Sequence, residues 1–161
     1  GGVFKLEFYT EAEIGEIIRR SAKILNIEIH DDAIKAIAER SRFTPRTANY
    51  FLKRCRDYAQ INKAPLSKEI VEKALSMLGV DNLGLTNADR DILKIMINKF
   101  GGGPVGLNTI AAALSEEQAT VEEVYEPYLI QLGLLERTPR GRSVTDKAYN
   151  HLEIKGSAKL L

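Results

Sequence analysis

The stretch GLLERTPRGRSVT, residues 133–145, decides the fold of the second half of this 161-residue chain. Two short runs that suit β-strands, LLERT and RSVT, flank the tripeptide PRG. Pro139 and Gly141 both favour chain reversal, so the stretch predicts a β-hairpin. Three predicted helices precede this hairpin, and that order is typical of a winged helix with the turn as its wing.

Three arginines, Arg137, Arg140 and Arg142, surround this turn, and we expect them to project from its tip. Guanidinium groups suit phosphate oxygens because their planar fork donates two hydrogen bonds at once. Glu136 is the only acid nearby in the sequence, although the whole chain carries a net charge of only +1. We therefore interpret the wing as a nucleic-acid contact. A solvated loop and a contact with a protein partner remain open as alternatives.

Capping residues and apolar periodicity predict the helices of the second half. Thr86 with Asp89 starts the first of them, which GGGPVG, residues 101–106, stops. A capping box of Thr120 with Glu123 starts the third. Its expected inward-facing residues are Val121, Val124, Tyr125, Tyr128, Leu129 and Leu132. The expected helices are residues 86–100, 109–114, 120–132 and 146–152.

The first half is predicted to be a bundle of four helices with short connections. The expected N-terminal caps are Thr10, which forms a capping box with Glu13, then Asp31, Thr44, which precedes Pro45, and Ser67. The residues expected to face inward are Ile14, Ile17, Ile18, Ala22 and Leu25 on the first helix and Ala48, Phe51, Leu52, Cys55 and Ala59 on the third. The Gly- and Asn-containing segment 79–86 then breaks the pattern, and we place a domain boundary there.

Composition excludes several classes of protein. No run of about 18 apolar residues is present, so no transmembrane helix is expected. The lone Cys55 excludes an internal disulfide and fits a reducing cytosol, so a cytoplasmic location is expected. With His30 and His151 as the only histidines, no metal site is expected. No catalytic set of Ser, His and Asp or of Cys and His is visible.

GGGPVGLN, residues 101–108, has the glycine spacing of a phosphate-binding loop but lacks the residues that bind. Leu107 and Asn108 stand where such a loop needs Lys and then Ser or Thr, and a helix rather than a strand precedes it. We interpret the segment as a turn between two helices.

The charges are distributed unevenly along the chain. Residues 40–63 contain seven basic side chains and one acid, Asp57. Among them, Arg46 lies in the first turn of a predicted helix, where the helix dipole disfavours a cation, and this hints at an anionic partner. A basic helix face exposed to solvent is the alternative. Residues 107–128 contain five glutamates and no Lys or Arg, which we interpret as a solvated helix face; the five are Glu116, Glu117, Glu122, Glu123 and Glu126.

Several motifs together resemble the C-terminal half of the RuvB family, the bacterial ATP-driven motors of Holliday-junction branch migration. The resemblance covers about residues 4–152, and its motifs are FYT, RSRFTPRTAN, DNLGLTNADRDIL, KFGGGPVGL, YEPYLIQLGLLERTPRGR and VTDKAY. It implies a mainly α fold, in which a four-helix AAA+ lid domain, residues 9–80, precedes a winged-helix head with a small β-hairpin wing, residues 82–152. Residues 1–8 are then the end of a large ATPase domain, and residues 153–161 are a tail.

The resemblance also assigns roles to individual residues. Arg46 in TPR matches the sensor 2 arginine, which reaches nucleotide phosphates, and Tyr9 in FYT matches a position that packs beside the nucleotide. Arg137 and Arg142 match wing arginines that contact the DNA backbone, and Arg140 lies between them. None of these residues is catalytic.

The family implies cofactors and partners that lie outside this sequence. The chain has no GxxxxGK[ST] motif, so we expect it to be part of a longer protein. We expect it to bind ATP or ADP with Mg only together with the large domain, and not to hydrolyse ATP alone. The implied partners are duplex and Holliday-junction DNA, RuvA, RuvC and further copies of the same protein in a hexamer.

Two positions depart from the family pattern. Phe43 stands where the family commonly has Gly, so the loop before the sensor helix is expected to bend differently. Gln118 stands where relatives often carry Arg, which is expected to weaken one DNA contact. Two other functions are consistent with the same sequence: a transcriptional regulator or replication initiator that prefers particular DNA sequences, and a protein-interaction module that uses the acidic face at 116–126.

Overall fold

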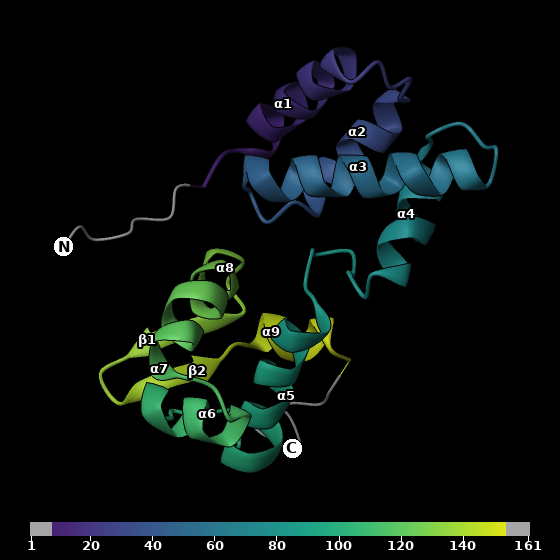
Figure 1. The fold of residues 1–161 in the computed structure, drawn as a ribbon. Coiled ribbons are helices and arrows are strands. Elements are labelled where there is room, and N and C mark those ends of the chain that lie inside the picture. Colours follow the sequence, from purple (N-terminus) through teal and green to yellow (C-terminus); the bar gives the residue numbers. More distant parts are fainter. Residues whose placement is uncertain (1–7, 154–161) are drawn as a thin grey trace. The chain divides into compact units, whose positions relative to one another are not determined.

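A computed structural model of the chain describes residues 8–153 (Figure 1). The chain divides into two compact units, one ending at Thr86 and one beginning at Asn87. The expectations for residues 1–7 and 154–161, which belong to the predicted linker and tail, lie outside the described residues. Across residues 8–153, no helix has both the length and the apolar character needed to cross a membrane.

The first unit is a bundle of four helices, as predicted. They are α1 (Glu11–Ile24), α2 (Asp31–Glu39), α3 (Pro45–Ile61) and α4 (Lys68–Met77). The longest, α3, contacts the other three helices (Figure 1). The loop before α2 and the loop before α4 also contact each other, through a β-bridge between Ile29 and Leu66.

Local sequence explains where three of these helices begin. Thr10 accepts a hydrogen bond from the backbone N–H of Glu13, whose carboxylate accepts one in return, so the capping box is confirmed. Thr44 and Ser67 cap α3 and α4 in the predicted way. The prediction that Asp31 caps α2 is wrong. His30 occupies the N-cap position without a capping hydrogen bond from its side chain, and Asp31 is the first residue of the helix and pairs with Arg19 at 3.1 Å.

The interior of the bundle is apolar and largely as predicted. All five inward-facing residues expected on α3 are buried. Leu25 was expected inside as well, but α1 ends one residue earlier and Leu25 is exposed. The backbone then turns at Asn26, with a φ of +56°, and Ile27 packs against the core instead.

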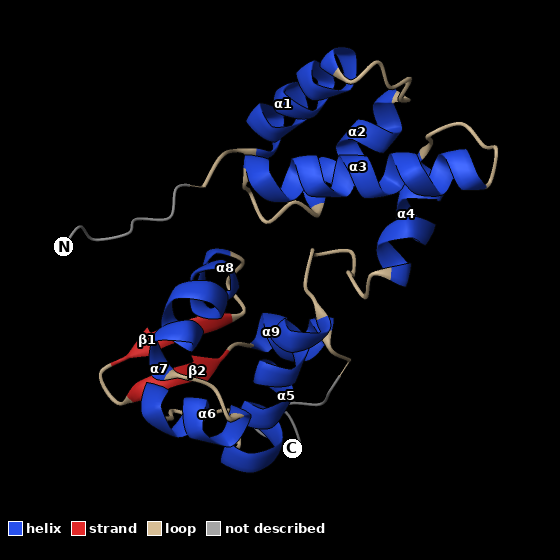
Figure 2. Cartoon of the chain, viewed as in Figure 1, coloured by secondary structure: helices blue, strands red, loops and turns tan. Residues whose placement is uncertain are grey.

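The second unit is a winged helix, which confirms the predicted fold class. Its elements are α5 (Asn87–Phe100), α6 (Leu107–Leu114), α7 (Gln118–Thr120), the π-helical segment η1 (Val121–Tyr125), α8 (Glu126–Gln131), β1 (Leu135–Thr138), β2 (Gly141–Val144) and α9 (Asp146–His151). Strands β1 and β2 pair in the antiparallel sense and form the one sheet in the described part of the chain (Figure 2).

Two helix starts in this unit differ from the predictions. Helix α6 begins at Leu107, two residues earlier than expected. The capping box at Thr120 is wrong, because α7 begins at Gln118 after Glu117, and Thr120 is its last residue. Thr120 therefore lies within a helical segment rather than ahead of one.

The π-helical segment changes which residues face the interior. Its defining bond joins the backbone N–H of Glu126 to the carbonyl of Val121, five residues earlier. Val121 and Glu126, five residues apart, are consequently both buried on the same side. In a regular α-helix, Val121 would share its face with Tyr125, four residues later. Val124, which was expected inside, is exposed.

Cys55 provides a test of the first unit. Burial raises the pKa of its thiol to about 12, against roughly 8.5 in an unfolded chain. The folded state gains stability by keeping this thiol neutral. The gain is full at a pH below the pKa that the thiol has in the unfolded chain, and it is lost as the pH rises through the pKa in the folded chain. We expect a thiol reagent at pH 8 to label Cys55 only as fast as the chain unfolds, and urea to accelerate labelling strongly. Rapid labelling of the folded chain would contradict the buried position.

Candidate functional site

The hairpin turn displays Arg140 at its tip. The Thr138 hydroxyl donates a hydrogen bond to the Gly141 carbonyl at 2.8 Å and accepts one from the backbone N–H of Arg140 at 3.2 Å, which closes the turn. The Arg140 side chain is exposed, and its guanidinium makes no hydrogen bond or ion pair within residues 8–153. Arg140 is therefore held at a defined place with its charge available.

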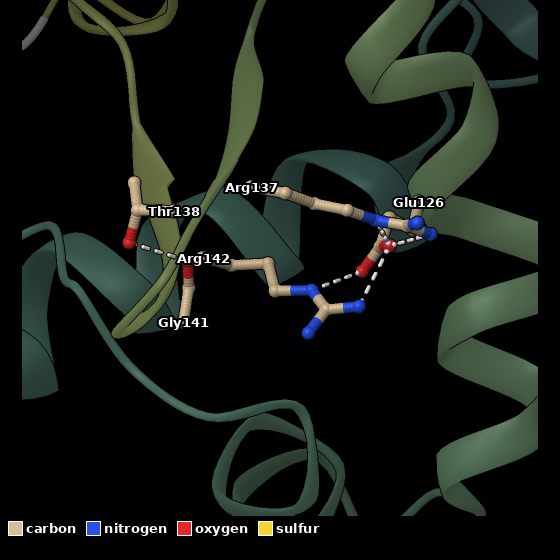
Figure 3. Close-up of polar contacts among 5 residues, drawn as sticks. All are labelled: Glu126, Arg137, Thr138, Gly141 and Arg142. Atoms are coloured by element: carbon tan, nitrogen blue, oxygen red, sulfur yellow. Dashed lines mark hydrogen bonds and ion pairs between the residues drawn. The ribbon is translucent and has the colours of Figure 1, made fainter.

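Arg137 and Arg142 are directly opposite each other on β1 and β2, and both turn toward Glu126 (Figure 3). Arg137 Nε donates to Glu126 Oε1 at 2.6 Å. Arg142 donates from Nε to Oε2 at 2.9 Å and from Nη2 to Oε1 at 3.1 Å, so this pair is bidentate. Both carboxylate oxygens are therefore occupied by wing arginines.

This cluster corrects two predictions. Glu126 was expected on a solvated face, but its side chain is only 1% exposed. Arg142 was expected to project from the tip, but its side chain is 19% exposed and packs toward Glu126, while that of Arg137 is 55% exposed. The hydrogen bonds to Glu126, together with the negative charges of Glu126 and Glu122, raise the pKa of Arg142 further above its ordinary range.

The base of the wing docks on the loop between α5 and α6. Val105 and Arg142 exchange backbone hydrogen bonds of 2.9 and 2.8 Å, and the Val144 N–H donates to the Gly102 carbonyl at 2.8 Å. The segment interpreted as a turn between two helices therefore also supplies a third backbone segment beside β2. Close approach requires glycine at 103, since a Cβ there would lie 2.3 Å from the Arg142 carbonyl oxygen.

In the first unit, Arg46 occupies the second position of α3 and is exposed. The first turn of α3 contains no acid, and within residues 8–153 the Arg46 guanidinium has no hydrogen-bond or ion-pair partner. The backbone N–H of Tyr9 donates to the carbonyl of Phe43 at 2.8 Å, just before this helix. The two residues expected to contact nucleotide therefore lie at the same end of α3.

The basic patch of residues 40–63 is smaller than the sequence suggests. Arg40 is buried, donates to the Ala36 carbonyl at 2.9 Å and lies 3.8 Å from Glu72. Arg56 pairs with Asp57 at 3.1 Å. Four of the seven basic groups are both exposed and unpaired in the described part of the chain: Arg46, Lys53, Arg54 and Lys63.

Sequence reasoning missed Glu126, although the motif YEPYLIQ that contains it was noticed. No local pattern signals its burial, because the arginines that bind its carboxylate lie eleven and sixteen residues later in the chain. Within residues 8–153, no group of His, Cys, Asp and Glu side chains is arranged to hold a metal ion.

Residues 9–81 match the sequence model of the RuvB AAA lid domain, and residues 82–153 match that of the RuvB C-terminal winged helix domain. The chain belongs to the RuvB family. The resemblance that its motifs suggested, and the lid and winged-helix fold that the resemblance implied, are thereby confirmed.

Individual RuvB relatives agree over nearly the whole chain. The Holliday junction branch migration complex subunit RuvB of Dehalococcoides mccartyi is 55% identical over 155 residues, which are 96% of this chain and 44% of the relative. That of Ligilactobacillus salivarius is 52% identical over 156 residues, 96% of this chain and 46% of the relative. The chain thus spans less than half the length of these two curated relatives.

A solved structure of the Thermotoga maritima RuvB Holliday junction branch migration motor shares the fold. It superposes with a TM-score of 0.91 at 51% identity, over 93% of this chain and 51% of the solved one.

The two positions expected to depart from the RuvB pattern, Phe43 and Gln118, lie at a turn and at an exposed site. Phe43 has a φ of +56°, in the left-handed region that glycine adopts without strain and other residues adopt at a cost of about 1–2 kcal/mol. Its ring makes an edge contact with Phe8 at a centroid distance of 6.3 Å, which offsets part of this cost. Gln118 is the exposed first residue of α7.

The docking of the wing can be tested at two neighbouring glycines. Gly103→Ala places a methyl group against the β2 backbone at a φ of +93°, whereas Gly101→Ala, at a φ of +61°, meets no atom within 4 Å. We expect Gly101→Ala to lower the free energy of unfolding by about 1 kcal/mol through backbone strain and Gly103→Ala to lower it by at least about 2 kcal/mol more. Urea unfolding measures both, and equal losses would contradict the close contact.

Proposed function

We propose that this chain is the lid and head portion of a RuvB-type ATP-driven DNA motor that acts in Holliday-junction branch migration. Residues 9–80 serve as the lid domain, and residues 82–152 serve as the head that grips DNA. The relatives' names support this proposal. Within the molecule, the observation that carries it is Arg140, which is exposed and has no partner within residues 8–153, at the tip of a wing whose base is docked by backbone hydrogen bonds.

The wing contacts the phosphate backbone rather than the bases. Arginine side chains on a hairpin tip reach phosphates of any sequence, and such contacts give affinity and register without reading bases. The three arginines contribute unequally. Arg140 has no partner in the part of the chain that the structure describes, Arg137 is partly exposed while bound to Glu126, and Arg142 is mostly covered. We therefore assign the strongest phosphate contact to Arg140.

The lid contributes to the ATP site of the complete motor. Arg46 acts as sensor 2, because its guanidinium and the N-terminus of α3 both favour an anion and the first turn of α3 contains no acid. Tyr9, linked through Phe43 to the same helix start, packs beside the nucleotide. ATP or ADP with Mg binds when a large ATPase domain with a phosphate-binding loop is present.

The complete motor assembles as the family resemblance implies. The Dehalococcoides relative is named as a subunit of a branch migration complex. We propose that a protein carrying this chain likewise works as a hexamer together with RuvA and RuvC on Holliday-junction DNA.

DNA binding tests the role of the wing. We expect this chain to bind unrelated duplexes equally, with a steep salt dependence, and Arg140→Ala to lower the slope of log K against log salt by about 0.9, the contribution of one phosphate contact. Fluorescence anisotropy over a salt series measures this slope. Arg20→Ala, which removes an exposed arginine from α1, is the control and should leave it unchanged.

The outcomes separate the candidate functions. Sequence-selective binding would indicate a transcriptional regulator or initiator, and a slope unaffected by Arg140→Ala would overturn the proposed wing contact. Charge reversal at Arg137 and Arg142 is a poorer test, since it would place new acids against the buried Glu126 and disrupt the wing itself.

ATP hydrolysis tests the role of the lid. In a chimera that joins this chain to the part of the Dehalococcoides relative that it does not match, we expect Arg46→Ala to lower ATP turnover roughly 100-fold, as loss of a phosphate-stabilising donor does. DNA binding should be unchanged. Arg54→Ala, which removes another exposed arginine of α3, is the matched control. Full turnover in the Arg46→Ala chimera would contradict the sensor 2 assignment.

A further inference from the structure

We infer that Glu126 is a positioning residue for the wing: its buried carboxylate holds the guanidinium groups of Arg137 and Arg142 side by side in the arrangement that meets DNA (Figure 3). This inference rests on the proposed DNA-binding function and deepens it. The family resemblance implies phosphate contacts by the wing arginines, whereas Glu126 carries the opposite charge and would itself repel DNA.

The burial of Glu126 shows that it is more than a surface counter-ion. Its side chain is 1% exposed, and a carboxylate at such a site is strongly disfavoured unless charged partners surround it. Arg142 supplies two of the hydrogen bonds and Arg137 supplies the bond from Nε, with Nη2 also in contact. The three side chains therefore depend on one another, and the cluster carries a net charge of +1.

The hydrogen bonds leave part of each guanidinium available. Glu126 uses Nε and Nη2 of both arginines, and Nη1 of each has no partner in the described part of the chain. Arg137 is also 55% exposed, so a phosphate oxygen can reach it while it stays bound to Glu126. An arginine held in this way loses little further rotamer freedom when it binds a phosphate, which favours binding.

Backbone geometry places Glu126 where it can act. It directly follows the π-helical segment, and the five-residue bond from its N–H to the Val121 carbonyl turns its side chain inward. From there it reaches both strands of the wing, eleven and sixteen residues later in the chain. Glu126 thus links the helical body of the head domain to the hairpin.

A pair of charge-matched variants tests the inference. Glu126→Gln and Glu123→Gln each remove one negative charge from the same segment, but Glu123 is exposed and has no partner within residues 8–153. Electrostatics alone predicts tighter DNA binding for both. Loss of positioning predicts that Glu126→Gln weakens duplex binding by roughly fivefold or more, because the arginines are no longer preorganised, while Glu123→Gln binds equally or more tightly.

The affinities are measured by anisotropy on the same duplex, with circular dichroism and thermal unfolding to verify that each variant is folded. Weaker binding by folded Glu126→Gln alone supports the inference. Binding by Glu126→Gln as tight as that by Glu123→Gln overturns it and leaves the proposed function standing. Absence of DNA binding by the parent chain overturns the proposed function and this inference together.

A second measurement covers the case in which Glu126→Gln does not fold. In the parent chain, the Nε–H protons of Arg137 and Arg142 should exchange with solvent more slowly than that of Arg140, since both are hydrogen-bonded to Glu126. Arginine-selective NMR resolves these signals. Equal exchange at Arg140 and Arg142 would show that the cluster does not form and would overturn the inference.

Discussion

The wing of the head domain depends on one buried carboxylate. Glu126 is almost fully removed from water, and its charge is tolerated because Arg137 and Arg142 approach it from the two strands of the hairpin. A buried ion pair need not add net stability compared with apolar residues of the same volume. It does fix geometry here, because the planar guanidinium groups of two strands converge on one carboxylate. The hairpin, which spans only four residues per strand, thereby acquires a defined position on the helical body.

Backbone contacts reinforce this position from the other side. Val105 pairs with Arg142 through two hydrogen bonds, so the residue that binds Glu126 with its side chain is also held by its main chain. Gly103 makes that approach possible, since a side chain there would collide with β2. The glycine-rich loop has the composition of a phosphate-binding loop, but its glycines permit close packing of the wing.

The two units use arginine in opposite ways. At the start of α3, Arg46 is exposed and the first turn of the helix contains no acid, so its charge and the helix dipole both favour an anion there. In the wing, two of three arginines are engaged by the protein itself, and only Arg140 is free within the described residues. RuvB relatives extend well beyond this chain, and the part they add is where we expect the nucleotide that Arg46 would meet.

The sequence by itself determined the features that depend on neighbours in the chain. Caps at Thr10, Thr44 and Ser67, the apolar face of α3 and the turn around Pro139 follow from side chains within a few residues of one another, so local rules predicted them. The motifs also identified the family. Only the tertiary structure decided that Glu126 is buried, because the π-helical segment shifts the helical phase by one residue and the stabilising arginines lie eleven and sixteen residues away. The sequence therefore shows which residues are charged, but not which charged side chains are buried or paired. The burial of Glu126 depends on partners from both strands of the hairpin, so the apolar period of its own helix does not predict it.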